Sequence, residues 1–130
     1  MPTKTRPKSP NVTIVSDNPE TLSGLQTYFD GAGVATHGTR TLGELDGVTA
    51  TTTAVVLFPD DFGDREVLTT IAHLRRTRPR VLLLLVTREP HKLDGALAPD
   101  GRSLPPMVLP KPSFGWTILD AIRMHADPTS

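Results

Sequence analysis

The most informative stretch of this chain is VLLLLV, at residues 81–86. All six side chains are apolar, and they do not alternate with polar residues. A strand that is apolar on both faces is typical of a parallel sheet covered by helices on both sides. Six residues are also far fewer than the roughly 20 that a membrane-spanning helix needs. The stretch therefore predicts a central, fully buried strand.

The segments on either side of this stretch alternate between strand-like and helix-like patterns. The other predicted strands are short runs at residues 11–15, 34–37, 53–58 and 107–109. Between them, apolar residues recur at helical spacing, as at Leu22, Leu25 and Phe29. Alternation of this kind predicts the α/β class, with a doubly wound, five-stranded parallel sheet and helices on both faces.

The limits of three helices can be read from capping and breaking residues. Asp17 or Asn18 can cap the first helix, and Ser113 can cap the last. The segment that should hold the fourth helix, residues 89–106, contains four prolines and two glycines. Proline removes a backbone donor and clashes with the preceding turn. The fourth helix is therefore predicted to be short or irregular.

Composition narrows the possible functions. The 130 residues carry a formal net charge of zero and include no cysteine. Disulfides, thiolate catalysis and cysteine-rich zinc sites are thereby excluded. The four histidines show no metal-ligand spacing, and no phosphate-binding Gly-Lys-Ser/Thr motif is present. The sequence thus predicts no cofactor and no bound metal.

The chain is expected to hold one domain, at residues 11–126. Residues 1–10 form a basic, proline-rich arm that is expected to be disordered, and residues 127–130 form a short tail. The arm is not followed by an apolar stretch of signal-peptide type. We therefore expect a cytoplasmic protein without a membrane partner.

Polar residues follow four of the predicted strands. They are Ser16-Asp17, Pro59-Asp60, Thr87-Arg88 and Lys111-Pro112. In open α/β sheets, functional sites lie beyond the carboxyl ends of the strands. These residues are therefore expected to meet at one edge of the sheet.

The last of these strand ends belongs to the motif MVLPKPSF, at residues 107–114. A strand that is followed by a Lys-Pro pair and an aromatic residue resembles the end of the receiver domains of bacterial two-component response regulators. With the order of elements, the resemblance covers about residues 11–126. It implies the sheet order 2-1-3-4-5 and a cis peptide before Pro112. It also implies an aspartate that accepts a phosphoryl group with the help of a divalent metal.

The resemblance places the family's phosphorylation pocket on specific residues of this chain. The acidic pair falls on Ser16 and Asp17, and the phosphoacceptor falls on Pro59. The hydroxyl and the lysine that contact the phosphoryl group fall on Thr87 and Lys111. Since Ser16 and Pro59 have no carboxylate, two of the three acidic groups are missing. The sequence therefore predicts a vestigial pocket, a pseudo-receiver without enzymatic activity.

An active receiver is the alternative. A shift of one residue would make Asp60 the phosphoacceptor, with Asp17 and Asp61 as magnesium ligands. We favour a solvated acidic turn at these positions, with Lys111 paired to Asp17 or Asp60. Arg88, which replaces a small residue of the family, is expected to fill the space of a phosphate. A flavodoxin-like binder of a small ligand is a third and weaker reading, because no phosphate loop is present.

A pseudo-receiver would act through protein–protein interaction. In the family, the fourth helix, fifth strand and fifth helix form the usual partner surface, whether for another protein or for a second copy. Val108, Phe114 and Trp116 are the candidate interface residues. Val108 stands where the family has its switch aromatic. Nucleic acid is not expected as a partner, because the arginines at residues 75–80 lie at a helix C-terminus, where cations oppose the helix dipole.

Overall fold

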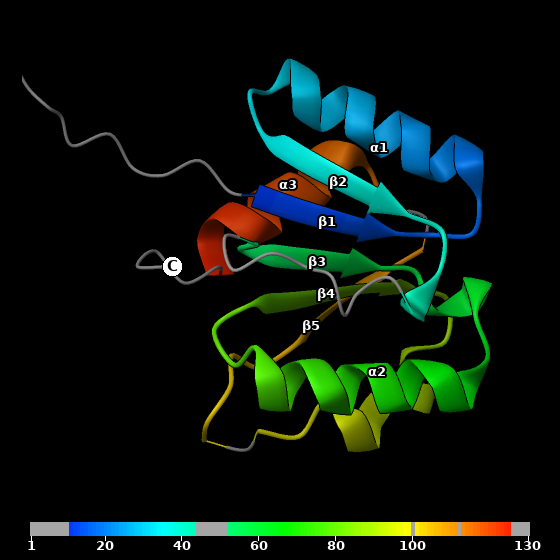
Figure 1. The fold of residues 1–130 in the computed structure, drawn as a ribbon, viewed down its shortest axis with the longest axis vertical. Coiled ribbons are helices and arrows are strands. Elements are labelled where there is room, and N and C mark those ends of the chain that lie inside the picture. Colours follow the sequence, from blue (N-terminus) through cyan, green and yellow to red (C-terminus); the bar gives the residue numbers. More distant parts are fainter. Residues whose placement is uncertain (1–10, 44–51, 100, 112, 126–130) are drawn as a thin grey trace, which may run out of the picture.

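A computed structural model describes residues 11–43, 52–99, 101–111 and 113–125. Five strands form one sheet in which all neighbours run parallel, in the order β2-β1-β3-β4-β5 (Figure 1). The strands are β1 (Asn11–Val15), β2 (Ala35–Thr39), β3 (Ala54–Leu57), β4 (Leu82–Thr87) and β5 (Met107–Pro110). The predicted α/β class and strand order are confirmed.

Helices cover both faces of the sheet. The regular helices are α1 (Pro19–Gly31), α2 (Asp64–Thr77) and α3 (Gly115–His125), and the 3-10 turns are η2 (Pro59–Asp61) and η3 (Pro90–Ala96). Helices α1 and α3 pack on one face, and α2 and η3 pack on the other (Figure 1). The fold thus has three layers, with one apolar cluster on each side of the sheet.

Strand β4 shows why the stretch at residues 81–86 has no polar side chain. Leu82, Leu84 and Val86 pack in the cluster under α1 and α3. Leu83 and Leu85 point to the opposite face and pack in the cluster under α2. Because successive strand residues alternate between faces, both sets must be apolar. Each fully buried leucine contributes about 1.5–3 kcal/mol to the free energy of folding.

The first helix is defined by its own end residues. The side-chain oxygen of Asn18 accepts hydrogen bonds from the backbone N–H groups of Glu20 and Thr21, so Asn18 is the predicted cap. After the helix, Gly33 adopts a φ of 79°, which favours glycine. The turn leads into Val34, which is buried, and then into β2. The strand runs from Ala35 to Thr39 rather than over residues 34–37, because its parallel register with β1 continues through Gly38.

The segment after β4 is irregular, as predicted. It forms the 3-10 turn η3 with Pro90 at its first position, and Leu93 is its buried anchor. The expected cap of the last helix is wrong: α3 begins at Gly115, one residue later than a Ser113 cap allows, and the hydroxyl of Ser113 donates to the carbonyl oxygen of Pro110.

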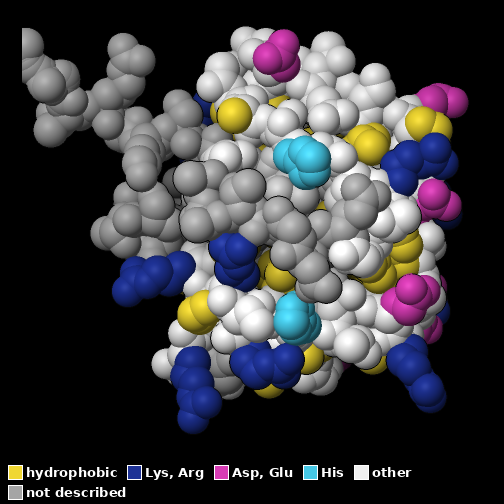
Figure 2. Space-filling model, in the orientation of Figure 1, with side chains coloured by type: hydrophobic (Ala, Val, Ile, Leu, Met, Phe, Trp, Pro, Cys, Tyr) yellow, Lys and Arg dark blue, Asp and Glu magenta, His cyan; other side chains and the backbone are white. Residues whose placement is uncertain are grey.

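The basic end of α2 has a structural role. Figure 2 shows lysine and arginine side chains gathered along the lower edge of the molecule, over α2. Among them, Arg75 donates from Nε to the hydroxyl of Ser103 and from Nη1 to the carbonyl oxygen of Ala96. These bonds attach the end of η3 and the segment after it to the C-terminal turn of α2.

Several predictions fall outside the described residues. They concern the arm at residues 1–10, the tail at residues 127–130 and the peptide bond before Pro112. Within the described ranges, no helix is both long enough and apolar enough to cross a membrane.

Candidate functional site

The polar strand ends lie at one edge of the sheet, as predicted. Backbone hydrogen bonds hold these ends together beyond the strands themselves. The N–H of Ser16 donates to the carbonyl oxygen of Thr39, and the N–H of Lys111 donates to that of Thr87. The ends of β1, β2, β4 and β5 are therefore in fixed positions before any side chain is considered.

Pro59 begins the turn η2 directly after β3 and Phe58. It is buried, and it occupies the first position of the turn, where the lack of an N–H costs nothing. The N–H of Asp61 donates to the carbonyl oxygen of Phe58, and the N–H of Phe62 donates to that of Pro59. The turn carries Asp60 and Asp61 on successive positions, about 120° apart in a 3-10 geometry. The two carboxylates consequently reach toward different strands.

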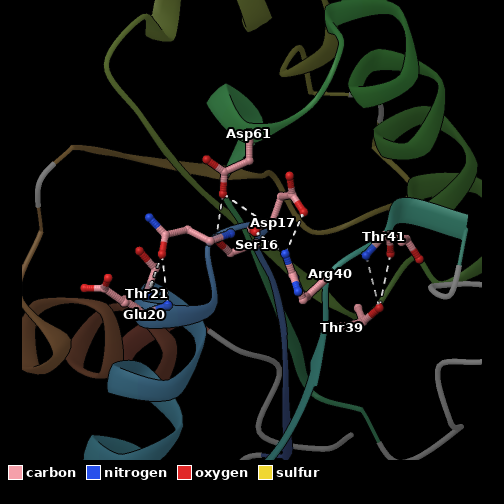
Figure 3. A network of polar contacts seen from close by, with 9 residues as sticks. Ser16, Asp17, Glu20, Thr21, Thr39, Arg40, Thr41 and Asp61 are labelled. Atoms are coloured by element: carbon pink, nitrogen blue, oxygen red, sulfur yellow. Dashed lines mark hydrogen bonds and ion pairs between the residues drawn. The ribbon is translucent and has the colours of Figure 1, made fainter.

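Asp61 turns toward the end of β1 (Figure 3). Its Oδ2 accepts a hydrogen bond from the hydroxyl of Ser16 at 2.6 Å and another from the N–H of Asp17 at 3.2 Å. The Ser16 hydroxyl also accepts from the N–H of Asn18 at 3.1 Å. Ser16 has no exposed surface. The buried hydroxyl of Ser16 thus fixes the carboxylate of Asp61, which lies 45 residues further along the chain.

Asp60 turns toward the end of β4. Its Oδ1 accepts from the hydroxyl of Thr87 at 2.6 Å, and its Oδ2 accepts from the N–H of Arg88 at 3.0 Å. Burial alone would raise the pKa of Asp60. The hydrogen bonds from Thr87 and Arg88, with the charges of Lys111 and Arg88, outweigh burial and lower the pKa below its ordinary value. Asp60 is therefore held as an ionised carboxylate.

The predicted partners of Lys111 are wrong. Its Nζ lies 3.8 Å from Oδ1 of Asp61, rather than next to Asp17 or Asp60, and 5.8 Å from the ring centroid of Phe58. Asp17 is instead paired with Arg40, whose Nη2 lies 3.5 Å from Oδ1 of Asp17 (Figure 3). The reason is the turn η2, which brings Asp61 between the ends of β1 and β5.

The donor set does not fit a divalent cation. Asp17 faces Arg40, Asp61 faces Ser16 and Lys111, and Asp60 faces Thr87. Magnesium needs several oxygens in near-octahedral geometry. Among the described residues, no three acidic or histidine side chains are grouped so as to hold a metal ion. The carboxylates are engaged by donors of the chain itself.

Solved structures share this architecture. A signal receiver domain of an HD domain-containing protein from Pseudomonas fluorescens Pf-5 matches with a TM-score of 0.72 and 21% identity, over 96% of this chain and 92% of that one. A response regulator receiver protein from Sinorhizobium medicae WSM419 matches with a TM-score of 0.72 and 13% identity, over 90% and 94%. This chain has the receiver fold.

A response regulator from Thermotoga maritima has the same fold, with a TM-score of 0.71 and 13% identity, over 95% of this chain and 100% of that one. No family model matches the sequence, and no curated protein does. The receiver fold is therefore carried by the arrangement of elements and by few shared residues. The chemistry of the strand ends has to be judged from this chain alone.

The receiver fold separates the three candidate interface residues. Val108 packs against the cluster on the α2 face. Phe114 and Trp116 instead flank Gly115, where an added Cβ would lie 2.9 Å from the ring of Tyr28 on α1. The rings of Phe114 and Trp116 are stacked, with centroids 4.3 Å apart and planes at 7°. The aromatic surface of this receiver fold is therefore formed by Tyr28, Phe114 and Trp116, without Val108.

Sequence reasoning missed three residues of the site. Arg40 lies after the β2 edge strand, and Tyr28 lies on a helix, so neither follows a strand end predicted to be functional. Asp61 was predicted to lie in a solvated acidic turn or, in the alternative, to bind magnesium, and not to contact Ser16 and Lys111. The order of elements could have indicated Arg40, because β2 ends beside β1, whereas the direction in which Asp61 points depends on the η2 turn.

Proposed function

We propose that this chain is a phosphorylation-independent receiver-type signalling domain that acts by binding a protein. The observation that carries the proposal is the pair of hydrogen bonds to Asp60. Its carboxylate accepts from the hydroxyl of Thr87 at 2.6 Å and from the N–H of Arg88 at 3.0 Å. Both donors lie at the strand end where the family's hydroxyl contacts a phosphoryl group.

A carboxylate and a phosphoryl group attract the same donors, because both are anions with exposed oxygen acceptors. In a phosphorylated receiver the hydroxyl on the fourth strand binds the phosphoryl oxygens. Here the Thr87 hydroxyl is already used by Asp60. The Thr87 hydroxyl is thus engaged in the unmodified chain, which supports a domain whose activity does not depend on phosphorylation.

The remaining residues of the pocket support the same proposal. Pro59, at the family's phosphoacceptor position, is buried and has no nucleophilic oxygen. Asp61 and Lys111 neutralise each other in part, at 3.8 Å. Asp60 has the ionised form that a phosphoacceptor needs, but the acidic groups around it face other donors. An active receiver phosphorylated on Asp60 with Mg²⁺ remains the alternative that the experiment must exclude.

The partner surface is proposed to be the aromatic one. The chain has six aromatic residues, and Phe114, Trp116 and Tyr28 are 65%, 54% and 39% exposed. Exposed aromatic side chains that gather on one surface are typical of interface hot spots. The partner is a protein, either a different one or a second copy of this chain.

The phosphorylation test uses the full chain with acetyl phosphate and magnesium, followed by intact mass. We expect no mass increase of one phosphate. The Ser16→Asp/Pro59→Asp variant is the matched control, since it restores both missing carboxylates. A stable phosphate adduct on the wild-type chain that is lost in Asp60→Ala would overturn the proposal.

The surface test is sedimentation velocity over a range of concentrations. A dimer that is lost in Trp116→Ala, but kept in Leu68→Ala on the exposed side of α2, would assign the surface to a second copy. A monomer at all concentrations would exclude a second copy as the partner.

A further inference from the structure

A cleft lies beside the vestigial pocket, between the end of β4, the start of η3 and β5. Its volume is about 480 Å³, and it is lined by Thr87, Arg88, Pro90, Val108, Pro110 and Lys111. Volumes of about 300–1,000 Å³ are typical of sites for small organic molecules. The cleft has the size of a small-ligand site and not that of a protein interface.

The small side chain of Val108 lies on one wall of the cleft. The resemblance to receivers places an aromatic residue at this position, and valine is much smaller. Pro90 and Pro110 are the other apolar residues of the lining. An apolar ligand group would therefore contact aliphatic carbon atoms on this wall and would lose part of its contact with water.

The charged residues of the lining are both cations, Arg88 and Lys111. The side chain of Lys111 is shared with Asp61 at 3.8 Å. The guanidinium of Arg88 makes no hydrogen bond or ion pair with the residues that the structure describes. Its exposed position differs from the expected role of filling the phosphate space, because only its backbone N–H contacts Asp60. The charge of Arg88 acts on Asp60 without a direct ion pair, so the planar N–H donors of its guanidinium are available to a ligand.

The charge of the ligand follows from the surrounding groups. A guanidinium binds a carboxylate through two parallel hydrogen bonds. Asp60, which carries a negative charge, accepts from Thr87 and from the N–H of Arg88, and Asp61 lies next to Lys111. A dianion would be repelled by these two carboxylates, whereas a monoanion can be balanced by Arg88.

We propose that this cleft binds a small organic monocarboxylate, with its carboxylate on Arg88 and its apolar body against Val108. The inference rests on the proposed function, because a phosphoryl group at this strand end would compete for the same cations. It adds an input to the domain: a ligand beside Thr87 would act on the strand end that phosphorylation modifies in active receivers.

The test is a titration of the full chain followed by ¹H–¹⁵N resonances, with phenylacetate as the probe. We expect saturable shifts at the backbone amides of Arg88, Val108 and Lys111, with a roughly millimolar dissociation constant, as is usual for a ligand of about ten non-hydrogen atoms. Phenylacetamide has the same shape without the charge, and inorganic phosphate has charge without an apolar body. Both should bind at least about tenfold more weakly.

Two variants locate the ligand. Arg88→Gln keeps the backbone N–H to Asp60, and it should weaken phenylacetate binding by roughly tenfold, since it removes one charge-assisted contact. Val108→Phe should fill the cleft and abolish the shifts. Arg123→Gln, on the exposed surface of α3, is the matched control and should bind as the wild-type chain does.

Equal binding of phenylacetamide, or phenylacetate binding that is unchanged in Arg88→Gln, would overturn the inference. These two results do not require Val108→Phe to fold. Failure of this titration leaves the intact-mass experiment unaffected, so that loss of the ligand site and loss of the proposed function can be told apart.

Discussion

Asp60 and Asp61 are neighbours on one turn, yet they belong to two different half-sites. Each accepts a hydrogen bond of 2.6 Å from a strand-end hydroxyl, Asp60 from Thr87 and Asp61 from Ser16. The Asp61 half is closed by Lys111 and by the fully buried Ser16. The Asp60 half, which consists of Asp60, Thr87 and the N–H of Arg88, is open to solvent. It lies next to the cleft that Arg88 and Val108 line. The turn that begins with Pro59 thus directs two neighbouring carboxylates to the ends of two different strands, β1 and β4.

The largest expected effect comes from breaking the Asp61 half. Ser16→Ala removes a buried hydroxyl that donates to Asp61 and accepts from the N–H of Asn18, and both hydrogen bonds are partly buried. Leaving such groups unsatisfied costs about 1–3 kcal/mol. We expect the free energy of unfolding, measured with urea, to fall by about that amount. Ser23→Ala, on the exposed side of α1, should change it by less than about 0.5 kcal/mol. An equal change in the free energy of unfolding in the two variants would show that the hydrogen bonds of Ser16 do not stabilise the fold.

Breaking the Asp60 half should have a smaller effect. Thr87→Val keeps the shape of the side chain but removes the hydrogen bond to Asp60. Since water can solvate the exposed carboxylate, we expect a loss of about 0.5–1.5 kcal/mol in the same measurement. Thr69→Val on the surface of α2 is the control. If the half-sites are independent, the Ser16→Ala/Thr87→Val double variant loses the sum of both values within about 0.5 kcal/mol. A larger deviation would mean that the turn couples them.

The pH dependence of the free energy of unfolding should show whether the ionised form of Asp60 stabilises the fold. The folded chain lowers the pKa of Asp60 below 3.8, so the unfolded chain binds the proton more tightly. The stabilisation is therefore present above the unfolded pKa and is lost as pH falls through the folded pKa. We expect the free energy of unfolding to decrease below about pH 4, and the decrease to be shallower in Asp60→Asn. An unchanged slope in that variant would contradict the pKa assignment.

The ion pairs should contribute least. Lys111→Gln removes a pair at 3.8 Å that is partly buried, and Arg40→Gln removes a pair at 3.5 Å between exposed side chains. Such pairs contribute about 0–1 kcal/mol. We expect the free energy of unfolding to fall by about 1 kcal/mol in Lys111→Gln and by about 0 kcal/mol in Arg40→Gln. Both variants are measured at low and at high salt. The reverse order would indicate that Asp17 and Arg40 hold the β1 end more firmly than Asp61 does.

The fold could be predicted from the sequence because it depends on apolar side chains. The six buried residues of β4, and the helical spacing of Leu25 and Phe29 on α1, require a layered sheet. The site could be predicted only in part. Ser16, Pro59 and Thr87 were placed at the correct edge, but the direction in which each carboxylate points depends on the 3-10 turn and not on any pattern. Lys111 was accordingly assigned to the wrong aspartate.

The burial of β4 has a consequence for the order in which the protein opens. Every residue of this strand is buried, and its backbone is paired on both sides, with β3 and with β5. Amide hydrogens in such strands exchange with solvent only when the whole domain unfolds. The 3-10 turn η3, which begins three residues after Thr87, lacks regular helical pairing and should exchange through local opening. Thr87 and Arg88, which donate to Asp60, thus lie between β4, where amide exchange should be slowest, and η3, where it should be fast. A small perturbation at this point can unfold η3 locally while β4 stays folded.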